Sequence, residues 1–220
     1  MNHQIDRILA EVVAPAAVAT DQTGAFPRQA VAALAEAGLL ALTVPREYGG
    51  GGQGLAAAAD LVRRLGEVCG STAMVVMMHY SATAALVAVD RGDVLTEIAA
   101  GRHLSTLAFS EVGSRSHLWA PLGTAVPDGD EVVLDARKSW VTSAGEADSY
   151  VWSSRPVTVG AGPMSLWLVR RDAPGLSVAG DFDGLGLRGN GSRPMVAKGV
   201  RVPRSALLGT DGGGLDLAMS

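Results

Sequence analysis

The sequence predicts an α+β protein, with an N-terminal all-helical domain followed by a middle domain that is a β-barrel or β-sandwich. Composition changes near residue 103, from an alanine-rich first half to a second half dense in Gly, Pro, Val and Ser. Before that point apolar residues recur at helical spacing, and after it short β-branched runs alternate with turn residues. We therefore place two domains at 1–103 and 104–210, and we expect 211–220 to be a loop entering a further helix.

The first half carries the start and stop signals of helices. Phe26-Pro27 opens a segment in which Val31 and Leu34 share an apolar stripe, and Gly38 stands where a helix C-terminal glycine is expected. A second stripe has charged residues largely on its other faces, which predicts an amphipathic helix. Its members are Leu55, Ala58, Val62 and Leu65.

The most apolar stretch, 74–89, predicts a buried helix. It is shorter than the roughly 20 residues that cross a bilayer, so no membrane span is expected. Ser71 or Thr72 is expected to cap this helix, because a hydroxyl at that place can accept a bond from a free backbone N–H. A short helix is expected over 93–100, before Gly101.

The second half predicts seven short strands, which suggests a barrel or a sandwich. Turn sequences such as Pro-Asp-Gly-Asp at 127–130 separate the strands. The predicted strands are 104–109, 123–126, 131–134, 150–153, 165–169, 176–179 and 194–202.

Composition excludes several classes of function. The 220 residues include one cysteine, Cys69, so an internal disulfide and a multi-cysteine zinc site are excluded, and a cytoplasmic location is expected. Cys69 itself is interpreted as a small buried apolar residue. Lys plus Arg number 18 against 22 Asp plus Glu, so no surface for nucleic acid is indicated. Asp6 and Glu11 lie where a secretory signal would need a basic start and an apolar stretch, so no such signal is expected.

The histidines do not predict a metal site. His3, His103 and His117 lack metal-ligand spacing, and the sequence contains no His-Glu-x-x-His. His79 lies on the apolar helix and is interpreted as a satisfied core residue.

Two strings predict a ligand site. Residues 107–117 read Leu-Ala-Phe-Ser-Glu-Val-Gly-Ser-Arg-Ser-His, which is typical of a strand running into a ligand-facing loop. Residues 138–144 read Lys-Ser-Trp-Val-Thr-Ser-Ala, so Trp140 and Thr142 are two positions apart and, on a strand, project from one face. A flat heteroaromatic ring would suit that face.

These strings resemble the two flavin-contacting signatures in the middle domain of the acyl-CoA dehydrogenase family, a Thr/Ser-Glu-Pro-Gly-x-Gly-Ser-Asp loop and a Lys-x-Trp-Ile-Thr-Asn strand. Further matches follow in family order at 45–50, 71–79, 184–189 and 200–209. The chain departs from the loop signature at Val112, Arg115 and His117, where the family usually has Pro, Gly and Asp.

The resemblance implies an FAD-dependent oxidoreductase of fatty acid metabolism, which dehydrogenates an acyl thioester across its α and β carbons with hydride transfer to flavin. It implies that Ser116 faces the substrate. The family's base glutamate lies in a C-terminal four-helix domain, so the resemblance implies that this domain and the base lie outside the 220 residues. The implied cofactor-binding residues are Leu107, Phe109, Ser110, Ser116, Trp140 and Thr142.

Several of these residues have structural alternatives. Glu111 lies inside the flavin loop, but a loop carboxylate is more often an acceptor for backbone N–H groups than a base. Trp140 could be a core tryptophan, and Ser116 could be a turn-forming serine. Arg115 and Arg188 could meet a ligand phosphate or carboxylate, or could simply be solvated.

Two glycine strings, 49–54 and 184–189, match Gly-x-Gly-x-x-Gly but are interpreted as turns. A dinucleotide fingerprint follows a strand directly and opens a helix. The later string runs into Asn-Gly-Ser-Arg-Pro, and Pro-Arg-Glu-Tyr separates the earlier one from the apolar run before it. Neither string ends in the Gly-Lys-Ser/Thr of a nucleotide-binding P-loop.

Three functions stay open at the level of sequence. The first is a dehydrogenase completed by a C-terminal helical domain or a partner chain. The second is a catalytically incomplete subunit that binds a thioester or a partner. The third is a flavin monooxygenase or oxidase of the same fold. In each case an apolar face of the helical domain would lack its usual cover, so a homo-oligomer or a complex with a partner chain is expected.

Overall fold

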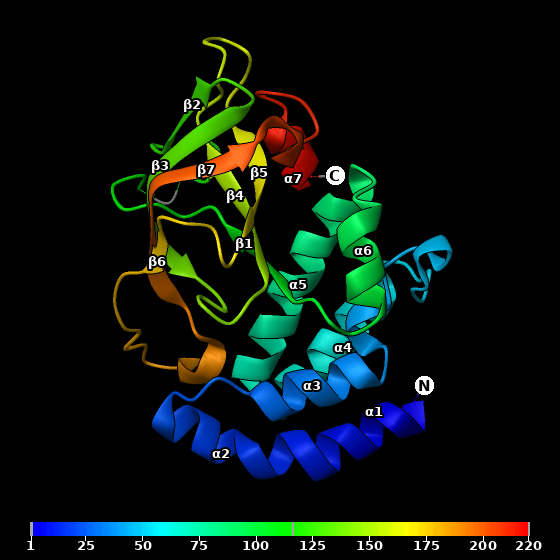
Figure 1. The fold of residues 1–220 in the computed structure, drawn as a ribbon. Coiled ribbons are helices and arrows are strands. Elements are labelled where there is room, and N and C mark those ends of the chain that lie inside the picture. The colour runs from blue at the N-terminus through cyan, green and yellow to red at the C-terminus, as the bar shows by residue number, and fades with distance from the viewer. Residues whose placement is uncertain (1, 116, 220) are drawn as a thin grey trace. The chain divides into compact units, whose positions relative to one another are not determined.

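The structure is a computed structural model that describes residues 2–115 and 117–219, and it contains two units (Figure 1). Unit 1 comprises the described residues up to 104 together with 182–191, and unit 2 comprises 105–181 and the residues from 192 onward. Helices fill unit 1, whereas two β-sheets fill unit 2. The prediction of an α+β fold, helical first and then β, is confirmed.

Unit 1 consists of helices joined by short turns. The first three helical segments follow one another without a break, and sequence analysis did not predict them. A single turn of π-helix, η1, lies between α1 and α2. The elements are α1 (Asn2–Ile8), η1 (Leu9–Val13), α2 (Ala14–Thr23), α3 (Arg28–Glu36), the 3₁₀ turns η2 (Leu39–Ala41) and η3 (Arg46–Tyr48), α4 (Leu55–Gly66), α5 (Gly70–Ala88), α6 (Gly92–Ala99) and the 3₁₀ turn η4 (Arg188–Asn190).

The predicted helices α3, α4 and α6 are present. Gly38 follows α3 with a φ of +69°, the left-handed conformation in which glycine ends a helix without strain. The string at 49–54 forms a turn before α4, as interpreted from the sequence.

Helix α5 begins earlier than predicted, and the cap predicted for it is wrong. Cys69 occupies the N-cap position, so Ser71 and Thr72 lie inside the first turn and neither caps the helix. The Thr72 hydroxyl instead donates to Cys69 Sγ at 3.3 Å. At 19 residues α5 is long and apolar enough to cross a membrane. However, 61% of its most apolar 18-residue stretch is buried, as in the core helix of a folded unit. Cys69 is buried, as predicted.

Residues 182–191 belong to unit 1, although the chain on both sides of them belongs to unit 2. The Gly189 N–H donates to the Ser71 hydroxyl at 3.1 Å. A Cβ on Gly189 would lie 2.2 Å from Thr20 Cγ2, so this close approach requires glycine. Arg188 pairs with Asp21 at 3.7 Å. The glycine string at 184–189 is therefore a turn that packs against α2 and α5, in agreement with its interpretation from the sequence.

Unit 2 contains two four-stranded sheets, with strand orders β1-β4-β5-β8 and β2-β3-β7-β6. The β1–β4 pair is parallel and the remaining pairs are antiparallel. Each of the seven predicted strands overlaps an observed one, and the two-residue β8 was missed. The elements are β1 (Ser105–Ala108), β2 (Thr124–Asp128), β3 (Glu131–Val141), β4 (Ser149–Ser154), β5 (Ser165–Arg170), β6 (Leu176–Val178), β7 (Arg193–Pro203), the 3₁₀ turn η5 (Arg204–Ala206), β8 (Leu207–Leu208) and α7 (Gly214–Met219).

Strand β3 is longer than predicted and irregular. Its pairing with β7 shifts register between Leu134 and Ala136 and again between Lys138 and Val141. Such shifts break the simple alternation of buried and exposed residues. The core of unit 2 lies around β4, all six residues of which are buried, and it includes the fully buried side chains of Trp152 and Trp167.

Candidate functional site

The two strings singled out in the sequence lie side by side in unit 2. The Ser139 N–H donates to the Ser110 carbonyl at 2.9 Å, and the Val112 N–H donates to the Arg137 carbonyl at 3.1 Å. Between these two bonds Glu111 and Lys138 form an isolated antiparallel bridge. Backbone hydrogen bonds therefore pair the segment that follows β1 with β3, just before Trp140.

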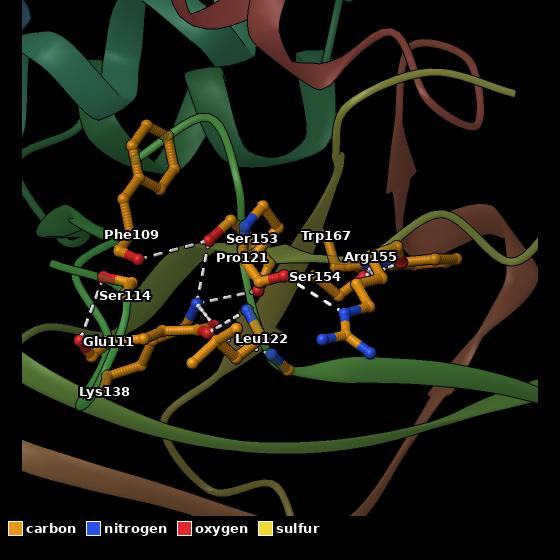
Figure 2. A network of polar contacts seen from close by, with 11 residues as sticks. Phe109, Glu111, Ser114, Pro121, Leu122, Lys138, Ser153, Ser154, Arg155 and Trp167 are labelled. Carbon is orange, nitrogen blue, oxygen red and sulfur yellow. Dashed lines mark hydrogen bonds and ion pairs between the residues drawn. The ribbon is translucent and has the colours of Figure 1, made fainter. Parts of the chain in front are cut away.

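The Glu111 carboxylate is buried, and both of its oxygens are engaged (Figure 2). Oε1 accepts a bond from Lys138 Nζ at 2.6 Å. Oε2 accepts bonds from the Leu122 N–H and from the Gly123 N–H, the latter at 2.9 Å. The interpretation of Glu111 as an acceptor for backbone N–H groups is confirmed.

Lys138 is a functional candidate that sequence analysis missed, although it begins the second string. Its side chain is 0% exposed, and Nζ also donates to the Ser153 carbonyl and hydroxyl, both at 2.8 Å. Nζ lies 5.1 Å from the centre of the Trp152 ring, within reach of a cation–π interaction. Burial lowers the pKa of the Lys138 ammonium to about 8, and the Glu111 carboxylate partly opposes that shift. A signal was available in the sequence, because the chain has only one other lysine, Lys198.

The loop at 111–123 has little secondary structure and exposes apolar side chains. The Ser114 hydroxyl donates back to the Glu111 carbonyl at 3.0 Å. The rings of His117 and Trp119 stack with 5.0 Å between their centres. The exposed apolar side chains of this loop are Val112, Leu118, Trp119 and Leu122. A loop that shows such groups to solvent, while both of its ends are fastened, has the form of a ligand-contacting segment.

Trp140 is 61% exposed, so it is not a core tryptophan. Thr142 is only 4% exposed, and its hydroxyl lies 3.1 Å from the Ser192 hydroxyl. The prediction that both residues stand on one strand is wrong, because β3 ends at Val141 and its register shifts just before that point. Thr142 begins the turn that follows, with its hydroxyl directed to a neighbouring loop.

Of the remaining predicted site residues, Leu107 lies on β1, and Phe109 and Ser110 follow it directly. Leu107 and Phe109 are half-buried, Ser110 is exposed, and Ser116 lies outside the described residues. The exposed indole of Trp140, the exposed Ser110 and the partly exposed Phe109 offer uncharged surface, which fits a flat, largely uncharged ring such as that of a flavin. Within 2–115 and 117–219, no three His, Cys, Asp or Glu side chains gather as metal ligands.

The helical unit, the two-sheet unit and the paired strings define the class of the chain, which has the architecture of the first two domains of an acyl-CoA dehydrogenase-type flavoprotein. The family model for the acyl-CoA dehydrogenase N-terminal domain matches residues 1–92, and that for the middle domain matches residues 106–200. The chain belongs to the acyl-CoA dehydrogenase family.

Individual relatives agree with this assignment. The chain is 32% identical to the probable acyl-CoA dehydrogenase YngJ of Bacillus subtilis, over 90% of this chain and 54% of that protein. It is 30% identical to the human mitochondrial short-chain specific acyl-CoA dehydrogenase, over 93% of this chain and 51% of that protein. An acyl-CoA dehydrogenase structure from Geobacillus kaustophilus superposes with a TM-score of 0.89 at 24% identity, covering 97% of this chain and 58% of that one, and so shares the fold. The chain spans about half the length of the curated relatives it matches.

Proposed function

We propose that this chain provides the FAD-binding and acyl thioester-binding part of a dehydrogenase that oxidises the α,β carbon–carbon bond of an acyl-CoA or a carrier-bound acyl group. The observation that carries the proposal is the pairing of the 111–123 loop with the end of β3, which sets the exposed Trp140 one residue beyond the Ser139–Ser110 hydrogen bond. Membership of a family of FAD-dependent oxidoreductases supports it.

In this proposal the chain's own residues bind and orient the flavin. Bound FAD would accept the hydride that leaves the β carbon of the acyl group. Trp140 covers one face of the ring and excludes water from it, and the hydroxyl or the backbone N–H of Thr142 bonds the ring edge. Leu107, Phe109 and Ser110 line the ring, and Ser116 lines both the ring and the thioester.

Glu111 does not act as the base in this proposal. Its two oxygens already accept three hydrogen bonds, and the residue is buried. A base must reach the proton that it removes. The α-proton is therefore taken by a carboxylate beyond these 220 residues, in a C-terminal helical domain or a partner chain. With that completion the assembly is an oligomer or a complex that acts in the cytoplasm.

We also propose that the domains follow the boundaries predicted from the sequence, at 1–103, 104–210 and 211 onward. The division of the described residues into two units between 104 and 105 supports the first boundary.

The proposal is tested first by absorption spectroscopy of the purified chain titrated with FAD. Trp140→Ala should weaken FAD binding at least tenfold. Val126→Ala should not change it, although it trims an exposed apolar side chain of the same unit. Absence of any flavin binding by the unchanged chain would reject a redox function and leave a binding or scaffold role.

A second measurement tests completion of the site. The chain is mixed with a separately produced C-terminal helical domain of a relative, and acyl-CoA is added without oxygen. Bleaching of the flavin in the mixture, but not in the chain alone, is expected if the base comes from outside. Rapid reoxidation of the bleached flavin in air would favour an oxidase or monooxygenase.

A further inference from the structure

The buried pair Lys138–Glu111 joins three segments that are distant in the sequence. Glu111 stands at the start of the 111–123 loop and bonds the N–H groups of Leu122 and Gly123 at its end. Lys138 on β3 bonds Glu111 and also bonds Ser153 on β4. Figure 2 shows these side chains converging from the three segments. Both ends of the loop are thus tied through one carboxylate to one ammonium group.

Lysine suits this position better than arginine would. Of the 18 basic residues in the chain, two are lysines, Lys138 and Lys198, and the rest are arginines. An ammonium group has three N–H donors on one small atom. At Lys138 the three acceptors are Glu111 Oε1, the Ser153 carbonyl and the Ser153 hydroxyl, so the donors are all used. The larger planar guanidinium carries its donors on several nitrogen atoms, so it would need acceptors that are spread more widely.

A glycine at the end of the loop is also adapted to this contact. A Cβ on Gly123 would lie 3.0 Å from Glu111 Oε1 and 2.6 Å from Ala136 Cβ. A side chain there would push the carboxylate away from Lys138. Glycine at this position therefore leaves room both for β3 and for the Glu111 carboxylate.

We propose that Lys138 is a positioning residue, whose ammonium group holds Glu111 and, through it, both ends of the 111–123 loop in the arrangement that the cofactor site uses. The contact between Lys138 and Glu111 forms without a ligand. Its effect on flavin binding rests on the proposed function. Lys138 itself has no exposed surface, so it acts through the loop and not by touching a ligand.

The positive charge of Lys138 holds the 111–123 loop in place through Glu111. The charged group that faces Nζ is Glu111, from the loop. The neighbours from β4, Trp152 and Ser153, are uncharged. Met195, which pairs with Lys138 from β7, is uncharged as well. A charge-assisted bond is stronger than a neutral one, so loss of the Lys138 proton weakens the hold on Glu111. Because burial lowers the pKa of Lys138 to about 8, this loss occurs in mildly alkaline solution.

The first test measures opening of the loop without flavin. Trypsin cleaves after Arg115 inside the loop and after Arg171 in an exposed turn of the same unit, and the ratio of the two rates reports the loop alone. Lys138→Met should raise the Arg115/Arg171 ratio at least tenfold. The matched variant Lys198→Met, which changes the other lysine at an exposed site on β7, should leave it unchanged. A ratio within twofold of that of the unchanged chain, in folded Lys138→Met, would overturn the proposal.

The same variants are then titrated with FAD. Lys138→Met should weaken binding at least tenfold, and Lys198→Met should not. If the unchanged chain binds no FAD, the proposed function fails while the cleavage ratio still decides whether Lys138 holds the loop. If the loop opens but FAD affinity is unchanged, the link to the cofactor site is refuted.

A third measurement uses the unmutated chain, and so does not depend on the folding of a variant. With ¹³Cε-labelled lysine the chain gives two lysine signals, which Lys198→Met assigns. The Arg115/Arg171 ratio should rise between pH 7 and 9 in step with the Lys138 signal. A ratio that stays flat while Lys138 loses its proton would overturn the role of its charge.

Discussion

Each unit buries a polar cluster, and the two clusters differ in charge. In unit 1 the His79 ring lies 3.0 Å from the Leu40 carbonyl, the Tyr80 hydroxyl donates to the Leu39 carbonyl, and the Thr83 hydroxyl donates to the His79 carbonyl. All three contacts use uncharged backbone acceptors; the first two join α5 to η2, and the third lies inside α5. In unit 2 the cluster is an ion pair, Lys138–Glu111, with neutral groups around it.

The difference follows from what each cluster holds. Helix α5 already has its own hydrogen bonds and a buried apolar surface, so neutral bonds suffice to fix its position. The 111–123 loop has exposed apolar side chains and few backbone bonds of its own, which makes it prone to local opening. A buried ion pair is costly to desolvate, but its geometry is specific. The charged cluster is thus found where a segment needs its position imposed from outside.

The largest expected effect comes from breaking the charged cluster. Lys138→Met leaves the Glu111 carboxylate buried without its cation, and loss of one partner of a buried pair costs about 3–5 kcal/mol. All four tryptophans lie in unit 2, so urea unfolding followed by tryptophan fluorescence reports this unit. The control Lys198→Met should change the unfolding free energy by less than about 0.5 kcal/mol.

A double variant separates charge from shape. Adding Glu111→Gln to Lys138→Met removes the uncompensated carboxylate, so the double variant should be more stable than Lys138→Met alone. Equal losses in the single and double variants would show that packing, and not charge, makes Lys138 important.

The next effect is a dependence of stability on pH. The unfolded chain keeps the Lys138 proton up to its ordinary pKa of 10.5, whereas the folded chain releases it near 8. Between these values the unfolded chain binds more protons, so the free energy of unfolding should rise with pH, by at most about 1.4 kcal/mol per unit. The measurement is the difference between the unchanged chain and Lys138→Met at each pH. A difference that shrinks from pH 8 to 10.5 would contradict the lowered pKa.

This pH dependence has an unusual consequence. Unit 2 should become more stable overall as Lys138 loses its proton, while the 111–123 loop becomes easier to cleave. A residue that only supported the fold would move both readings in the same direction.

Much of the fold could be predicted from the sequence, because its elements depend on local patterns. The stripes of α3 and α4 and the seven strand segments follow from periodicity and turn residues. The segment at 2–23 was missed because its apolar residues show no clear helical stripe, and it includes a turn of π-helix. The cap of α5 was misplaced by two or three residues, because element boundaries are the part of a helix that sequence patterns define least.

The sequence predicted which segments form the candidate site, but not the contacts that join them. The strings predicted that the segments around Ser110 and Trp140 matter, and Glu111 was correctly interpreted as an acceptor. The partnership of Glu111 with Lys138 spans 27 residues and depends on how β1, β3 and β4 meet. The position of Thr142 depends on a register shift near the end of β3, which strict strand alternation does not anticipate.

In the uncharged cluster, Tyr80→Phe tests the contact between α5 and η2. The Tyr80 hydroxyl is buried and donates to the Leu39 carbonyl, so its removal should cost about 1–2 kcal/mol. Far-UV circular dichroism at the helix wavelength follows unit 1 during urea unfolding, since its helices dominate that signal. A loss above about 3 kcal/mol would mean that the neutral cluster matters as much as the charged one.

The smallest effect is expected from Thr83→Val on the same helix. The Thr83 hydroxyl donates at 2.8 Å to the His79 carbonyl four residues earlier, which the backbone N–H of residue 83 also bonds in an α-helix. Valine has nearly the same shape and leaves that carbonyl with its backbone partner, so the loss should stay below about 0.5 kcal/mol. The same unfolding experiment measures it beside Tyr80→Phe. A larger loss for Thr83→Val than for Tyr80→Phe would show that bonds inside α5 matter more than the bond from α5 to η2.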